Sequence, residues 1–196
     1  LSVIDIPEEP IRTKFGPKIL HTRKIGIADR EGKPRFLIGI SVDATERNLL
    51  ESLNKIRRLI LETLASDQPL NAILAYVSSL IEQHSPEALC SILLLDSAGR
   101  HLLHGAAPSL PEFYNQALNG IAIGPEIGSC GAAAFSGTRV IVEDVMTHPY
   151  WASFADLARQ AGLRSCWSEP IRAADGKILG VFALYHRNPC VPDTKD

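Results

Sequence analysis

The stretch GSCGAAAFSGTRVIVEDVMTHPYWASFADLARQAGLRSCWSEPIRAADGKILGVFALYHRNP, residues 128 to 189, holds most of the pattern that decides the fold. It opens with a Gly-Ser-Cys-Gly turn and an alanine run, and a strand-like segment follows at residues 139 to 145. After a helical segment at residues 150 to 161, two apolar runs at 164 to 172 and 178 to 186 flank the turn Ala-Asp-Gly-Lys. An Asp-Gly turn between apolar runs is a strong hairpin signal. The stretch therefore predicts a sheet that ends in a C-terminal hairpin.

A second pair of strands precedes this stretch. Residues 89 to 95 and 101 to 106 are apolar runs on either side of Asp-Ser-Ala-Gly, another turn signal. Short helices are expected at residues 110 to 118 and 130 to 135. Helices that share one side of a mostly antiparallel sheet define an α+β domain. This is the fold class that the sequence predicts.

A long helix is expected over residues 44 to 65, where Asp43 or Thr45 can cap its first turn. Its apolar residues recur at steps of four, three and four, the spacing of a coiled-coil seam. They are Leu49, Leu53, Ile56 and Ile60. The seam predicts a homodimer, and an ordinary amphipathic helix lying on its own domain is the alternative, because the repeat is short. The next helix carries a wider apolar face, typical of burial against a core, made by Leu70, Ile73, Leu74, Val77, Leu80 and Ile81.

The first 47 residues read as strands and turns. Residues 19 to 27 and 36 to 42 are strand-like and flank a polar turn, which predicts an antiparallel hairpin, and another strand is expected near Ile11. An isolated hairpin is marginally stable in water. We therefore expect this segment to be the end of a domain whose beginning lies outside the sequence.

Composition limits the function classes. The chain has 196 residues, 45% hydrophobic content and a formal charge of −2, which is typical of a globular protein. Nucleic-acid binding is disfavoured because no basic excess is present. The apolar runs are too short to span a bilayer and no leader opens the sequence, so neither membrane insertion nor export is expected. Four cysteines occur without a C-x-x-C pair, which favours reduced thiols and a cytoplasmic location over a zinc site or a dithiol motif.

Cys130 allows two interpretations. A thiol on a glycine turn at a helix N-terminus is expected to have a lowered pKa, which would make it a nucleophile. Free cysteine is also among the most often buried side chains, and small residues let a helix pack closely on a sheet. The local sequence favours the structural interpretation.

The quoted stretch resembles the second half of a GAF domain of the bacterial signalling type. The resemblance rests on the Gly-x-Cys-Gly-x-Ala turn, the Val-x-x-Asp strand, the Cys-Trp-Ser-x-Pro-Ile strand and the Asp-Gly-x-x-Leu-Gly-x-Phe-Ala-Leu-Tyr hairpin, which all occur in that order. It extends back to about residue 66. The resemblance implies a sensory module that binds a small ligand, dimerises, or does both, and controls an output domain absent from this chain. The output expected is a cyclic di-GMP enzyme or a histidine kinase of a two-component system.

Upstream, GPKILHTRKIGIADREGKPRFLIGISVDATERN, residues 16 to 48, resembles the last strands of a PAS domain and its Asp-x-Thr-Glu-Arg exit. The exit residues are Asp43, Thr45, Glu46 and Arg47. In PAS proteins this exit begins a helix that passes a signal to the next module. The domain division expected is a PAS remnant at 1–47, a signalling helix at 44–65, a GAF domain at 66–190 and a tail at 191–196.

A ligand pocket is implied where GAF pockets form, between the sheet and its covering helices. Aromatic and polar side chains near this place are the candidate ligand-binding residues. They are Trp151, Phe154, Arg164, Trp167, Glu169 and Tyr185. The alternative is that Trp151 and Trp167 simply fill the core. The sequence names no cofactor and leaves the ligand unidentified.

Some GAF domains catalyse a reaction or bind a specific cofactor, and the residues of this chain favour none of these activities. Free methionine sulfoxide reductases share the turn of Cys130, but Gly120 stands where their partner cysteine is expected, and Cys166 could serve only if the fold brings it near. The prediction is therefore that the chain is not an enzyme, with a Cys130 thiol enzyme and a ligand-free dimerisation spacer as alternatives. Bilin, haem and cyclic nucleotide are disfavoured, because Cys166 precedes Trp167, the histidines form no readable site and the cyclic-nucleotide signature is absent.

Overall fold

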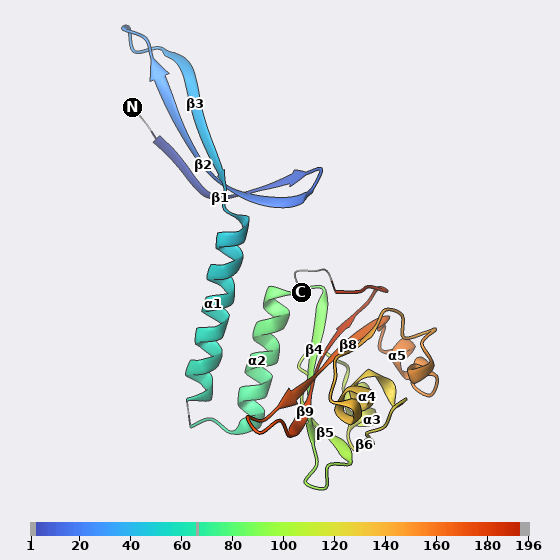
Figure 1. Cartoon of the computed structure of the whole chain (residues 1–196). Helices are drawn as coiled ribbons and strands as arrows, with labels where there is room; N and C mark the ends of the chain where they lie inside the picture. The colour runs from blue at the N-terminus through green and yellow to red at the C-terminus, as the bar shows by residue number, and fades with distance from the viewer. Residues whose placement is uncertain (1–2, 66, 193–196) are drawn as a thin grey trace. The chain divides into compact units, whose positions relative to one another are not determined.

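The computed structural model describes residues 3–65 and 67–192 (Figure 1). The chain divides into two compact units, Leu1–Glu62 and Thr63–Asp196, which are described separately. The expected start of the GAF domain at Ser66 and the end of the tail, residues 193–196, lie outside the described residues. No helix in the described ranges is long and apolar enough to cross a membrane.

The first unit contains a three-stranded antiparallel sheet in the order β1-β2-β3. Its strands are β1 (Val3–Thr13), β2 (Gly16–Ala28) and β3 (Pro34–Asp43). The polar turn between β2 and β3 is held by Asp29, whose Oδ1 accepts hydrogen bonds from the backbone N–H groups of Glu31 and Lys33. The expected hairpin is confirmed, and β1 adds the third strand. Large apolar side chains of β3 are exposed, among them Phe36, Leu37, Ile40 and Val42.

Helix α1 (Thr45–Leu64) follows β3. The backbone N–H of Thr45 donates to Asp43 Oδ1 over 3.0 Å, so Asp43 holds the first turn as expected. In the expected seam, Leu49 and Leu53 are about half exposed, at 48% and 51%.

The second unit is built on a six-stranded antiparallel sheet in the order β6-β5-β4-β9-β8-β7. The strands are β4 (Ala88–Leu95), β5 (His101–Ala106), β6 (Ile121–Ala122), β7 (Val140–Val142), β8 (Ser165–Arg172) and β9 (Ile178–His186). The helices are α2 (Leu70–His84), α3 (Glu112–Leu118), α4 (Gly128–Ser136) and α5 (Ala155–Gln160), with a 3₁₀ turn η1 (Pro149–Trp151). This is the predicted α+β class.

The two faces of the sheet are covered unequally. Helix α2 contacts β4 and β5, and α4 contacts β7, β8 and β9 from the other side, as Figure 1 shows. The main core lies between the sheet and the α3, α4 and α5 layer, and it includes Val181, Ala183 and Tyr185 of β9. The intervening residues of β9, Phe182 and Leu184, point to the α2 face because successive strand residues alternate.

Local boundaries differ from the expectations in three places. The helix expected at 150 to 161 is broken into η1 and α5, because His148 Nδ1 accepts from the backbone N–H of Tyr150 and starts a tight turn at Pro149. Strand β7 covers only three residues of the seven expected. The two-residue strand β6 was not expected, and it pairs with His101 and Leu102 of β5.

Candidate functional site

The alternation of β8 and β9 divides the expected ligand-binding residues between two places. Trp167 pairs with Leu184 and Glu169 with Phe182, and all four lie on the α2 face. Tyr185 lies on the core face, where Trp151 and Phe154 join it around a small cavity. The residues expected to form one pocket therefore form two separate groups.

Arg164 belongs to neither group. Its Nη2 lies 2.7 Å from Asp144 Oδ2 and its Nε lies 3.2 Å from Oδ1, so a bidentate ion pair occupies the guanidinium. The hydrogen bond from Arg164 lowers the pKa of Asp144. Asp144 Oδ1 also accepts from the backbone N–H of Met146. Arg164 thus stabilises the loop after β7 through its ion pair with Asp144.

On the core face, two thiols and two hydroxyls form the thiol cluster, made of Cys130, Cys166, Ser168 and Tyr185. Cys130 Sγ lies 3.4 Å from Ser168 Oγ and 3.6 Å from Tyr185 Oη. Cys166 Sγ lies 3.5 Å from the same Ser168 Oγ. All four residues are buried.

Helix α4 and the sheet together create the thiol cluster. The helix begins at Gly128, whose φ of 55° is a left-handed conformation that favours glycine. Cys130 is the third residue of the helix and reaches β8 and β9. Cys166 of β8 pairs with Tyr185 of β9. The register of these two strands therefore brings Cys166, Ser168 and Tyr185 to the same part of the core face.

The two thiols are not equivalent. A hydrogen bond with Cys166, together with those of Ser168 and Tyr185, lowers the pKa of Cys130 to about 7 against the opposing effect of burial. Burial raises the pKa of Cys166 well above its usual value. Backbone N–H groups at the start of α4 favour negative charge on Cys130 in the same direction. Cys130 is therefore the thiol of the pair that ionises first.

A cavity of about 20 Å³ lies beside Cys130, which suffices for about one water-sized molecule. Trp151 closes it on one side, and its Nε1–H donates to Ser129 Oγ over 2.8 Å. Phe154 packs against Trp151 with ring centroids 6.4 Å apart. Trp151 is thus a buried core residue, as the alternative interpretation of the sequence expects.

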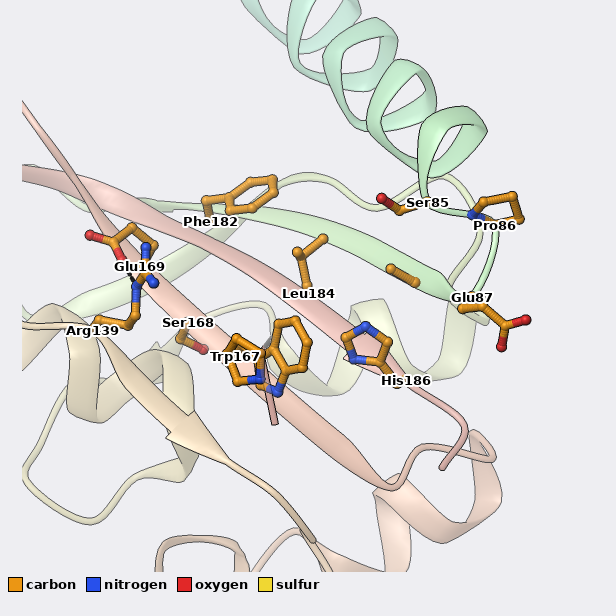
Figure 2. A pocket seen from close by; sticks show the side chains of 12 residues that line it. Ser85, Pro86, Glu87, Arg139, Trp167, Ser168, Glu169, Phe182, Leu184 and His186 are labelled. Atoms are coloured by element: carbon orange, nitrogen blue, oxygen red, sulfur yellow. Dashed lines mark hydrogen bonds and ion pairs between the residues drawn. The ribbon is translucent and has the colours of Figure 1, made fainter. Parts of the chain in front are cut away.

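A much larger groove, of about 580 Å³, lies on the α2 face of the sheet. Its floor is formed by side chains of β8 and β9, and the turn after α2 borders it, as Figure 2 shows. The lining side chains used below are Arg139, Trp167, Glu169, Phe182, Leu184 and His186. We call this space the sheet groove.

Polar groups stand at both ends of the sheet groove. Arg139 Nε lies 2.5 Å from Glu169 Oε2 at one end. At the other end, the rings of Trp167 and His186 pack against each other with centroids 4.3 Å apart and a tilt of 44°. Trp167 Nε1–H donates to the carbonyl of Cys190 over 3.1 Å. The His186 ring and the Cys190 carbonyl thus fix the orientation of the half-buried Trp167 side chain.

Sequence reasoning missed several of these residues. The sequence allowed Cys166 as a partner of Cys130 only if the fold brought it near, and the packing of α4 on β8 does so. Ser168, which contacts both sulfurs there, was not singled out. Phe182 and Leu184 could have been placed on one face with Trp167 by aligning the closing hairpin about its Asp-Gly turn. No group of three or more His, Cys, Asp and Glu residues within the described ranges could hold a metal.

The sequence model of the GAF domain matches residues 64–196. The methyl sulfide methyltransferase-associated sensor of Methanosarcina acetivorans is 38% identical over 154 residues, which cover 79% of this chain and 15% of that protein. This chain thus corresponds to a small part of that protein's length.

Two solved structures illustrate the likeness of fold. The GAF domain of a phosphoenolpyruvate-protein phosphotransferase from Coxiella burnetii has a TM-score of 0.60 and 17% identity, covering 76% of this chain and 84% of that one. Free methionine-R-sulfoxide reductase from Neisseria meningitidis has a TM-score of 0.56 and 22% identity, covering 78% and 80%.

The reductases correct one prediction. The prediction that this chain is not an enzyme is wrong as an inference from the fold class, because enzymes are among the solved structures that share its fold. At 22% or 23% identity this likeness shows the fold and carries no activity over to this chain.

Proposed function

Since the chain belongs to the GAF domain family, we propose that it is the sensory part of a signalling protein and binds a small molecule in the sheet groove. The name of the relative at 38% identity, a sensor, supports the sensory role. The volume of the groove carries the proposal for the site. Ligand pockets usually measure roughly 300–1,000 Å³ and combine an apolar lining with a few polar groups.

The lining of the sheet groove favours a ligand with an apolar, planar body. Trp167, Phe182 and Leu184 offer aromatic and aliphatic surface, against which a flat ring system can stack. Arg139 and Glu169 neutralise each other at one end. They can therefore offer one donor and one acceptor to the ligand without demanding a net charge.

The output is proposed to lie outside this chain, as a cyclic di-GMP enzyme or a two-component histidine kinase. The first 47 residues are proposed to be the end of a PAS domain, with α1 as the signalling helix and residues 66–190 as the GAF domain. In a dimer, paired α1 helices would be the two-state element that ligand binding biases.

Tryptophan fluorescence tests the site. The chain has two tryptophans, so in a Trp151→Phe variant all tryptophan emission comes from Trp167 in the sheet groove. Titration with a panel of apolar ring-containing metabolites should give saturable changes in this emission and a raised melting temperature for at least one compound.

Two β9 variants provide the control. Phe182→Ala should abolish the response, whereas Leu179→Ala should keep it, because Leu179 lies on the same strand outside the sheet groove and is 44% exposed. Binding that survives Phe182→Ala would place the ligand elsewhere and overturn the proposed site.

A ligand-free dimerisation spacer is the second candidate. It is favoured by the small size of the core cavity, about 20 Å³, and by the apolar seam of α1. A stable dimer with no melting shift across the panel would support this function over ligand binding.

A further inference from the structure

The thiol cluster has a chemical capacity that ligand binding in the sheet groove does not use. Cys130 on α4 and Cys166 on β8 contact the same hydroxyl, at 3.4 Å and 3.5 Å from Ser168 Oγ. They are 36 residues apart in sequence and meet only in the fold. We propose that Cys130 and Cys166 form a reversible disulfide when hydrogen peroxide reaches the thiol cluster, which makes this pair a redox-modification site.

The surroundings favour Cys130 as the sulfur that attacks first. It lies in the first turn of α4, where backbone N–H groups stabilise a thiolate. The hydroxyls of Ser168 and Tyr185 are within hydrogen-bonding distance of its sulfur. Cys166 lies within β8, paired with β7 and β9, and burial raises its pKa, so it remains a thiol at neutral pH.

Access to the pair also runs through Cys130. Cys130 lines the cavity of about 20 Å³ and is 7% exposed, whereas Cys166 is fully buried. Hydrogen peroxide is little larger than water, so a cavity of this size selects it over bulkier oxidants. Phe154, which is half-buried, stands at the border of the same cavity.

The reaction balances in two steps. The Cys130 thiolate attacks one oxygen of hydrogen peroxide; an S–O bond forms, the O–O bond breaks, and the departing hydroxide takes a proton to become water. Cys130 is then a sulfenic acid, oxidised by two electrons. The Cys166 sulfur next attacks the Cys130 sulfur; the S–S bond forms, the S–O bond of the sulfenic acid breaks, and the hydroxide leaves with the Cys166 proton as a second water. In sum, two thiols and one hydrogen peroxide give one disulfide and two waters.

The remaining cysteines provide internal controls. Burial raises the pKa of Cys90 to about 12, which leaves it a thiol that reacts slowly. Cys190 is half-buried and its sulfur lies 3.1 Å from Ser165 Oγ. Neither residue touches the thiol cluster in the contacts described above.

The test treats the whole chain with excess hydrogen peroxide, quenches it with iodoacetamide in denaturant, and maps the peptides by mass spectrometry. The free thiols should fall from four to two, with the loss of two hydrogen masses and one linked peptide pair containing Cys130 and Cys166. Dithiothreitol should restore all four. Cys130→Ser and Cys166→Ser should each abolish the link, and Cys90→Ser should leave it unchanged.

The outcomes separate this proposal from the proposed function. Cys130 and Cys166 both found alkylated after peroxide treatment would overturn it, as would a disulfide that uses another cysteine or joins two chains. The wild-type peptide map decides the matter even if a serine variant fails to fold. Since the fluorescence titration concerns the opposite face of the sheet, either result stands whatever that titration gives.

Discussion

Among single residues, Ser129 accepts a buried hydrogen bond whose loss should lower the stability of the fold. Its Oγ accepts the indole N–H of Trp151 at 2.8 Å, and both residues are buried. A buried donor left without an acceptor loses its hydration with no replacement. The Ser129 hydroxyl is therefore the acceptor that replaces water for the buried indole N–H.

Ser129→Ala should lower the free energy of unfolding by about 1–3 kcal/mol, because the Trp151 N–H would remain buried without an acceptor. Urea unfolding followed by circular dichroism measures the change. As a control, adding Ser129→Ala to a Trp151→Phe background should cost less than it does in the wild type, since that background has no indole donor. Equal costs in both backgrounds would mean that the hydrogen bond is not the cause.

The ion pair of Asp144 and Arg164 should make the free energy of unfolding depend on pH. Hydrogen bonding to Arg164 lowers the pKa of Asp144 in the folded state. A lowered folded pKa adds stability above the unfolded value, near 3.9 for aspartate, and this stability is lost as pH falls through the folded pKa. The stability gap between wild type and Asp144→Asn should thus be constant from about pH 7 to pH 5 and close below about pH 4. Urea midpoints at each pH measure it, and a gap that widens in acid would contradict this assignment.

At the scale of elements, β9 depends on a glycine where it runs beside β4. A methyl group at Gly180 would overlap the backbone carbonyl of Leu93, which cannot move without disturbing the central strand pair. Backbone overlap in a sheet is among the mechanisms that produce large losses.

Gly180→Ala should therefore destabilise the second unit by at least about 2 kcal/mol. Gly26→Ala on β2 is the matched control, because a methyl group there meets no atom within 4 Å. Differential scanning calorimetry of both variants makes the comparison. Similar melting temperatures for the two variants would show that β9 can shift away from β4.

The elements show which parts of the fold can be predicted from the sequence alone. Both hairpins of the large sheet follow from turn residues and apolar runs, and Asp43 is a readable helix start. The break between η1 and α5 depends on a His148 side chain bonding to the backbone, which periodicity does not encode. The thiol pair could be named only on the condition that the fold brings Cys166 near Cys130. A sequence pattern describes each element separately, and the two residues meet through the packing of α4 on β8.

For the whole molecule, the seam of α1 carries the prediction of a homodimer. Leu49 and Leu53 are about half exposed, and two parallel copies could cover them. Leu53→Lys should weaken dimerisation at least tenfold, because it places like charges opposite each other in the seam. Leu61→Lys is the control, since Leu61 is 56% exposed and lies outside the seam. Sedimentation equilibrium measures both, and an unchanged dimer in Leu53→Lys would exclude this seam as the interface.

The two faces of the large sheet divide the functions proposed for this molecule. The α2 face carries a groove of about 580 Å³ suited to a small molecule, and the core face carries two thiols beside a cavity of about 20 Å³. Trp167 and Cys166 are neighbours on β8 that point to opposite faces, so one strand borders both sites. The two proposed inputs can therefore be tested separately by mutation.

Native mass spectrometry of the protein as purified from cells tests the sensory role most directly. We expect a dimer that carries one small molecule per chain, and the same dimer without that mass in Phe182→Ala. A dimer with no added mass, which also gains none when incubated with the metabolite panel, would contradict it.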